Sequence, residues 1–199
     1  MTARDAARAL KLVGRRLSID FVNIASAGIP ISWLTLVQFL EATQIVAADR
    51  AAQLLALPQS DPAATHVLRL KAQRLSAALR EAFSALLRKQ KIALEWTEPV
   101  NEILRITEGH DELVPQGGGW RLEFIAREGG LDWLLAAVAR SGAEIVAEGS
   151  QARLRRCANP RCGLFFYDTS RTRQRRWCSM ALCGNRSKVA AFARRHSSE

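Results

Sequence analysis

The sequence predicts an α+β fold, in which a mostly helical N-terminal domain with a few short antiparallel strands precedes a small four-cysteine module that ends in a helix. Apolar residues repeat at helical spacing over much of residues 1–150, which predicts the helices. All four cysteines lie in the last 43 residues. Residues 150–199 hold 12 Lys and Arg against 2 Asp and Glu, whereas residues 1–149 hold 17 against 17. We therefore predict a neutral domain over residues 1–150 and a basic module over residues 151–199.

The first elements are predicted from periodicity and capping signals. Residues 17–24 alternate apolar and polar side chains, which is the period of a half-buried strand. Three helices follow: one with Thr35 as its cap, one over about residues 47–57 that Pro58 ends, and a long one over about residues 62–89. The long helix has a strong start signal, because Asp61 suits the N-cap and Pro62 suits the first helical position.

The second half of this domain is predicted to add a short helix, a hairpin and a last helix. The short helix spans about residues 98–107, with Thr97 as its cap. Strands over about residues 112–115 and 120–125 flank the glycine run 117–119 and predict the hairpin. The last helix spans residues 131–147, and Gly149 stops it.

The basic module is predicted to contain two short strands, over residues 152–156 and 164–167, and a final helix that starts at about residue 186. On a helical wheel one face of this helix is apolar, and we expect it to dock on the rest of the chain; it holds Val189, Phe192, Ala193 and His196. The opposite face is cationic and holds Lys188, Arg194 and Arg195.

The four cysteines form two C-x4-C pairs, Cys157 with Cys162 and Cys178 with Cys183. This spacing is typical of two-knuckle zinc ribbons, in which two loops offer four thiolates to one tetrahedral ion. Gly163 and Gly184 directly follow the second cysteine of each pair, where a glycine lets backbone N–H groups turn toward the sulfurs. The sequence therefore predicts one zinc ion per chain.

Two disulfides or four unliganded buried thiols are the alternatives to zinc. Disulfides require an oxidising compartment, yet residues 1–16 contain no apolar stretch that would act as a secretory signal. We expect a soluble cytoplasmic protein, since no apolar run reaches the length of a membrane span, and in the cytoplasm the cysteines stay reduced. This favours the zinc site.

The residues around the cysteines resemble the CGNR zinc finger, a bacterial module named for the string found here at residues 183–186. The match includes the first cysteine pair, Phe166, residues 168–171, residues 175–180 and Lys188. In that family the module follows a domain called ABATE, and the string DFVN at residues 20–23 resembles its opening signature. The resemblance implies a CGNR-type treble- or ribbon-like finger after an ABATE-like domain that senses a signal or dimerises. The family is regarded as stress-induced transcription regulators, which implies DNA binding.

The charge of the module independently predicts a polyanion partner, with nucleic acid the usual candidate. The expected binding residues lie in the loop between the cysteine pairs and on the final helix: Arg171, Arg173, Arg175, Arg176, Arg186, Lys188, Arg194 and Arg195. We expect Arg173, Arg175, Arg194 and Arg195 to project away from the cysteines. Neutralisation of the zinc–thiolate charge, RNA binding and binding of an acidic protein are the alternatives. One small module offers limited contact area, so we also expect a homodimer.

Two polar residues near the cysteines have predicted local roles. Asp168 is expected to cap the loop that follows it or to pair with an arginine such as Arg176. Trp177 is expected to cover the zinc site rather than to stack on a base.

The neutral domain shows little chemistry. His66 and His110 lack the context of a metalloprotease motif or a catalytic triad, and the glycines at 117–119 do not follow a phosphate-loop pattern, so we expect no enzymatic activity. Asp20 and Asn23 are polar residues in an apolar segment. They indicate either buried hydrogen bonds that fix the fold, which we favour, or a pocket for a small-molecule effector.

Overall fold

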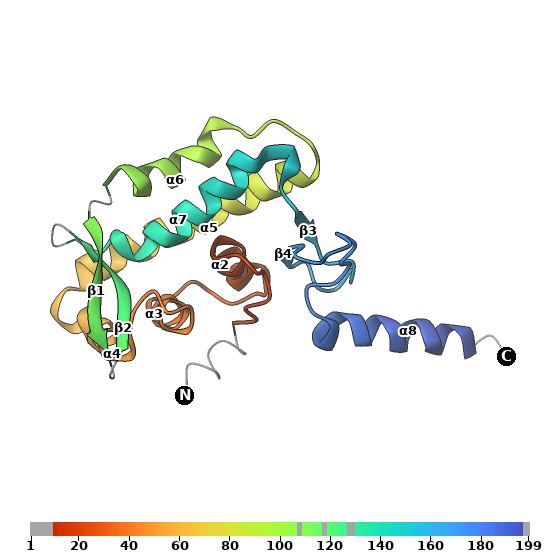
Figure 1. Cartoon of the computed structure of the whole chain (residues 1–199), viewed down its shortest axis with the longest axis horizontal. Helices are drawn as coiled ribbons and strands as arrows, with labels where there is room; N and C mark the ends of the chain where they lie inside the picture. Colours follow the sequence, from red (N-terminus) through yellow and green to blue (C-terminus); the bar gives the residue numbers. More distant parts are fainter. Residues whose placement is uncertain (1–9, 107–108, 117–118, 127–129, 197–199) are drawn as a thin grey trace.

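The computed structural model describes residues 10–106, 109–116, 119–126 and 130–196. Its helices pack into a body at one side of the molecule, and the last helix extends from the other side (Figure 1). The described strands form two antiparallel pairs, β1 with β2 and β3 with β4. The fold is thus α+β and mostly helical, as predicted.

The segment predicted as the opening strand is instead a helix, α2 (Leu17–Ser26). It lies against α5 (Pro62–Leu87), α7 (Trp133–Glu148) and strand β4 (Phe165–Tyr167). Every residue from 18 to 24 except Asp20 is buried, so neighbours surround the helix on nearly all sides. A helix buried all round has no polar face and no helical period in its sequence, which is why the alternation was misleading.

Helices α3 (Trp33–Ala42) and α4 (Ala48–Ser60) have different limits from those predicted. Ser32 is the N-cap of α3, and its hydroxyl accepts a hydrogen bond from the Thr35 N–H at 3.1 Å, so Thr35 lies inside the helix. Pro58 also lies inside α4, which continues to Ser60. The start of α5 is confirmed, since Asp61 accepts a bond from the Ala64 N–H at 2.9 Å.

The remaining elements of the body agree with the prediction except at one cap. Helix α6 (Leu94–Ile106) begins before Thr97, whose hydroxyl donates to the Leu94 carbonyl at 2.9 Å. Strands β1 (Gly109–Gln116) and β2 (Gly119–Ala126) pair antiparallel as the predicted hairpin, whose residues 117–118 lie outside the described part. Helix α7 ends at Gly149, which has φ 55°, as glycine permits; a short 3-10 turn (Gly149–Gln151) leads on to β3.

The small module packs against the body through its hairpin. Leu154 of β3 (Leu154–Arg156) and Phe165 of β4 belong to the core of the body, and the Phe165 ring lies 6.1 Å from that of Phe83. Phe166, the next residue, belongs to a separate cluster around the cysteines. Because successive side chains of a strand point to opposite faces, one strand contributes to both cores. Packing of the module on the body, rather than loose attachment, follows from this arrangement.

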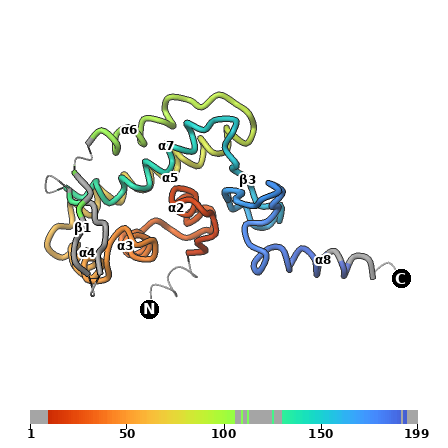
Figure 2. The backbone as a smooth tube through the Cα atoms, viewed as in Figure 1, coloured from red at the N-terminus to blue at the C-terminus, as the bar shows by residue number. Residues whose placement is uncertain are grey.

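The final helix, α8 (Asn185–His196), does not dock as predicted. It contacts mainly the single π-helical turn that precedes it (Met180–Gly184) and extends away from the body (Figures 1 and 2). Val189 and Phe192 are 68% and 57% exposed. The hairpin β3–β4, rather than α8, packs into the core of the body. No described helix has the length and apolar character needed to cross a membrane.

Candidate metal centre

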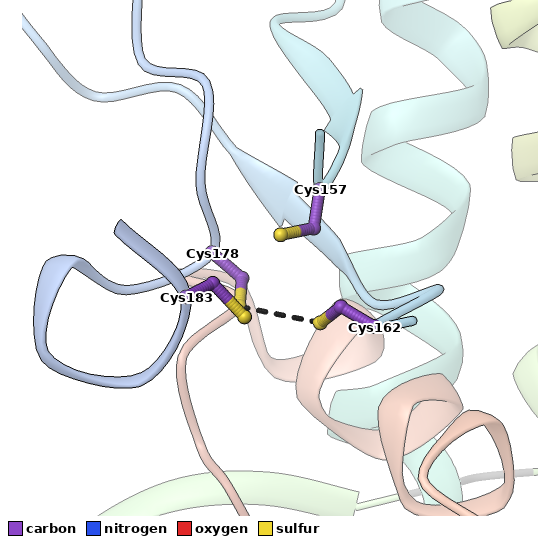
Figure 3. Close-up of side chains that lie close together, drawn as sticks. All are labelled: Cys157, Cys162, Cys178 and Cys183. Atoms are coloured by element: carbon purple, nitrogen blue, oxygen red, sulfur yellow. Dashed lines mark hydrogen bonds between the residues drawn. The ribbon is translucent and has the colours of Figure 1, made fainter. Parts of the chain in front are cut away.

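The four cysteine sulfurs converge on one point between the hairpin and the turn before α8 (Figure 3). All lie within 4.8 Å of one another, with 3.6 Å between Cys162 and Cys178 and 3.7 Å between Cys178 and Cys183. Four sulfurs at about 2.3 Å from a tetrahedral zinc would be about 3.8 Å apart, whereas a disulfide requires about 2.05 Å. The cluster therefore suits one zinc ion, and the cysteines are not paired as disulfides.

The first pair is held by the tight loop of the β3–β4 hairpin. The Cys157 N–H donates to the Leu164 carbonyl at 2.9 Å, and the Cys162 N–H donates to the Asn159 carbonyl at 2.9 Å. Gly163 has φ 68°, a left-handed conformation that a side chain would disfavour. As predicted, this glycine turns the chain back toward the cysteines, and the Leu164 N–H bonds to the Cys162 sulfur.

The second pair is held by the π-helical turn that leads into α8. The Ser179 carbonyl accepts bonds from the N–H groups of Cys183 and Gly184 at 2.9 and 3.0 Å, and the Ser179 hydroxyl accepts one from Leu182 at 3.3 Å. Gly184 has an ordinary φ, but a Cβ there would lie 2.5 Å from the Met180 sulfur. That sulfur belongs to a flexible side chain that is 49% exposed and can move aside, so neither backbone conformation nor packing requires glycine at this position.

The electrostatics of the cluster favour a bound cation. Burial raises the pKa of the Cys162 thiol to about 11 and also raises the pKa of Cys178. Burial acts the same way on Cys183, but hydrogen bonds from the other thiols and from the Asn159 side chain hold its pKa below the ordinary value. Arg186 adds a guanidinium nitrogen 3.9 Å from the Cys183 sulfur. A metal ion supplies the positive charge that four buried thiolates need.

Asp168 organises the loop between the cysteine pairs. Its side chain is fully buried and accepts bonds from the Ser170 N–H and hydroxyl at 3.0 and 2.6 Å and from the Arg175 N–H at 3.0 Å. Burial alone would raise the pKa of Asp168, but these bonds and the charge of Arg155 hold it below the usual value. The predicted capping role is confirmed, whereas the arginine partner is Arg155, at 3.1 Å, and not Arg176.

Arg175 is part of the module's interior, so the expectation that it projects away from the cysteines is wrong. Its guanidinium donates to the carbonyls of Trp177 (2.9 Å), Cys178 and Val13 (3.3 Å). It also stacks on the Phe166 ring at 4.6 Å. Arg175 therefore connects β4, through Phe166, and the second cysteine pair, through Cys178, to the N-terminal segment at Val13.

Five of the other predicted cations of the loop and helix lie on the surface. Arg171, Arg173, Arg176, Arg186 and Lys188 are exposed. Arg176 stacks on the ring of Trp177, which is partly buried against the cysteine cluster as predicted, at 5.2 Å. The side chains of Arg194 and Arg195 lie outside the described residues.

Sequence reasoning missed three exposed cations on the hairpin, Arg155, Arg156 and Arg161. Their position beside the first cysteine pair in the sequence was the available signal. Arg156 stacks on the Phe165 ring at 4.9 Å and still reaches solvent. The cationic surface of the module therefore includes its hairpin as well as its loop and helix.

Asn23 joins the body to the metal module. It is fully buried, its amide donates to the Phe165 carbonyl at 2.9 Å, and its oxygen accepts from the Phe165 N–H at 2.9 Å. The side chain thus supplies hydrogen-bond partners for the N–H and carbonyl of Phe165 in β4, as a neighbouring strand would. Of the two roles considered for Asn23, the geometry supports the structural one.

Asp20 holds the segment before α2 in place. It accepts bonds from the N–H groups of Gly14, at 2.7 Å, and Val13. The Gly14 carbonyl in turn accepts from the Tyr167 N–H at 2.7 Å, and the Val13 carbonyl accepts from Arg175. Asp20 and Asn23, one turn apart on α2, therefore attach two segments of chain to the same strand of the module.

We expect Asp20 to titrate near pH 6. Burial raises the pKa of this carboxyl to about 6, against the opposing effects of the Gly14 and Val13 N–H groups and the nearby charge of Arg15. Because the folded-state pKa exceeds the unfolded value, the stabilising contribution of Asp20 is complete below about pH 4 and is lost as the pH rises through about 6. Carboxyl-carbon NMR of the zinc-loaded protein, with Asp20→Asn for assignment, measures the midpoint; a value below 4.5 would contradict the expectation.

Comparison with known proteins identifies one part of the chain. A search of curated proteins by sequence found no match. Residues 153–196, which contain all four cysteines and both knuckles, match the family model of the CGNR zinc finger. This similarity and the geometry of the sulfurs agree on zinc, and they identify residues 153–196 as similar to a CGNR zinc finger.

Proposed function

We propose that the protein is a bacterial transcription regulator that binds duplex DNA through residues 151–199. The observation that carries the proposal is the confinement of the net positive charge to one end of the chain. Residues 150–199 contain 12 Lys and Arg and only 2 Asp and Glu, whereas in residues 1–149 the positive and negative residues are equal in number. The described cations of the loop, the hairpin and the start of α8 are mostly exposed. Phosphate groups of a nucleic acid are the partner that such a surface attracts most strongly.

The metal centre would contribute by fixing the backbone that carries these cations. Asp168 and Arg175 hold the two ends of the loop, and Arg171 and Arg173 stand between them at the surface. A preorganised loop loses little conformational entropy when it meets a phosphate backbone. Four cysteine ligands complete a tetrahedral zinc, which is typical of structural rather than catalytic sites and supports a binding protein over an enzyme.

In this proposal residues 1–150 form an ABATE-like domain. This domain senses a signal in the cytoplasm, for example during stress, or it dimerises. A homodimer would present two modules and so double the limited contact area of one. Val189 of α8, which is 68% exposed, is apolar surface that such an assembly would cover.

The salt dependence of binding tests the proposal. With about four phosphate contacts, log K for duplex DNA should fall with log salt at a slope near −3.6. Changing Arg171 and Lys188 together to Gln should reduce the slope by roughly 2 units, because both are exposed and neither has a hydrogen bond or ion pair among the described residues. Fluorescence anisotropy with labelled duplex measures both quantities.

The matched control is Arg50→Gln with Lys91→Gln, which removes the same charge from exposed positions of the body. It should leave affinity and slope nearly unchanged. Single-stranded RNA and an unrelated acidic protein are titrated in parallel, since the same charge would attract them. Absence of duplex binding at low salt, or tighter binding of either competitor, would refute DNA as the partner.

A further inference from the structure

A groove of about 400 Å³ lies in the body, away from the metal centre, between α5 and the segment that joins α2 to α3. Its apolar walls come mainly from that segment and from the end of α2: Ala25, Ile29, Pro30 and Ile31, with Ala77 of α5 opposite. This volume lies within the range of small-molecule sites.

Three polar side chains of α5 also line the groove: Gln73, Ser76 and Arg80. Their spacing of three and four residues places them on one face of the helix. In the part of the chain that the structure describes, each has a polar group with a weak partner or with none. None of the residues that line the groove is acidic.

Ser76 is the most informative of these residues. It is 3% exposed, and its hydroxyl has no hydrogen-bond partner among the residues that the structure describes. A buried hydroxyl without a partner is costly and uncommon in native proteins. Its position on the wall of the groove therefore points to a ligand atom as the missing partner.

Gln73 and Arg80 complete the polar side. The Gln73 amide nitrogen donates to the Ile31 carbonyl at 3.1 Å, which fixes the side chain, and its oxygen has no hydrogen-bond partner among the described residues. Arg80 has a half-exposed side chain, which among the described residues forms an ion pair with the adjacent Glu81 at 3.5 Å. Such a pair contributes little in water, so the guanidinium can turn to a carboxylate.

The opposite wall is preformed. Gly28 has φ 79°, which glycine adopts without strain, and its N–H donates to the Ala25 carbonyl at 3.0 Å. The Ile29 N–H donates to the Ile24 carbonyl at 3.1 Å. These bonds hold the segment in its turn, so a ligand would not have to order it.

We propose that this groove binds a small organic carboxylate with an apolar tail. The carboxylate pairs with Arg80 and accepts the Ser76 hydroxyl, and the tail lies against Ile29 and Ala77. The inference rests on the sensing role proposed for residues 1–150. The groove lies at the end of α2, the helix whose Asn23 holds β4 of the metal module, so its ligand would contact an element that positions the module.

Titration of the full zinc-loaded chain with hexanoate, followed by amide NMR without DNA, tests the site. Signals of residues 25–31 and 73–80 should shift in a saturable way, and hexanamide, which lacks the charge, should bind more weakly. Arg80→Gln should weaken hexanoate binding about tenfold or more, because a charge-assisted hydrogen bond is lost. Ala77→Phe, at an exposed position, should fill the groove and abolish binding.

Arg74→Gln is the matched control, because Arg74 lies on the same helix, is exposed, and does not line the groove. It should bind hexanoate like the unchanged protein. Absence of shifts in these residues, equal binding of hexanamide, or unchanged binding by both Arg80→Gln and Ala77→Phe would overturn the proposal. DNA plays no part in this measurement, so failure here and failure of the salt titration are separate results.

Discussion

Replacing Cys178 by Ser is expected to remove the zinc and to unfold residues 157–196. Cys178 is fully buried, and its sulfur is in contact with those of Cys162 and Cys183, so three ligands cannot close the tetrahedron. The separate cluster around the metal has few buried residues apart from the cysteines, chiefly Leu164 and Phe166. Metal binding supplies about 10–16 kcal/mol in zinc-finger peptides, far more than so small a core can provide.

Unfolding of the module should also destabilise the body, since Leu154 and Phe165 belong to the core of the body. We expect zinc content to fall from about one ion per chain to near zero, with limited proteolysis cutting the module first and the melting temperature of the remainder lowered. Ala181→Ser adds a hydroxyl to an exposed position of the same turn and should keep the zinc. A metal-free protein with a folded C-terminus would contradict this.

Asn23→Ala is expected to destabilise the protein by about 2–5 kcal/mol while zinc content stays near one ion per chain. The change leaves the N–H and carbonyl of Phe165 buried without a partner, at about 1–3 kcal/mol each. It also leaves a cavity at a fully buried position. Chemical denaturation measures the free energy of unfolding.

Asn101→Ala is the matched control for this experiment, because Asn101 is exposed on α6. It should change the free energy of unfolding by less than about 0.5 kcal/mol. A similarly small effect of Asn23→Ala would mean that the contact between Asn23 and β4 does not hold the module to the body.

The metal centre was predictable because its requirements are local. Four thiolates in two short loops and a glycine after each pair can be recognised without knowledge of the rest of the fold. The long helix α5 was equally accessible, since Asp61 and Pro62 mark its start and its apolar period is sustained. Ser32 and Thr35 show the limit of this reasoning, because either hydroxyl suits an N-cap and only the hydrogen bond distinguishes them.

Other features depend on contacts between distant segments. The helical state of α2 follows from neighbours on almost every side, and these leave no periodic pattern in ten residues. Arg175 belongs to an arginine-rich run that resembles a solvent-exposed surface, yet Val13 and Phe166 draw its guanidinium inward. The exposed face of α8 is the converse, because Val189 and Phe192 have the pattern of a docking helix and the hairpin takes that place.

Duplex binding as a function of zinc occupancy is the most direct test of the central claim, which is that zinc organises a cationic surface for DNA. The dissociation constant is measured at low salt on one preparation, first loaded, then stripped by a chelator, then reloaded. The account predicts binding with a steep salt dependence, its loss on stripping and its recovery with one zinc ion per chain. Equal affinity of the stripped and loaded protein, or no binding by the loaded protein, would contradict it.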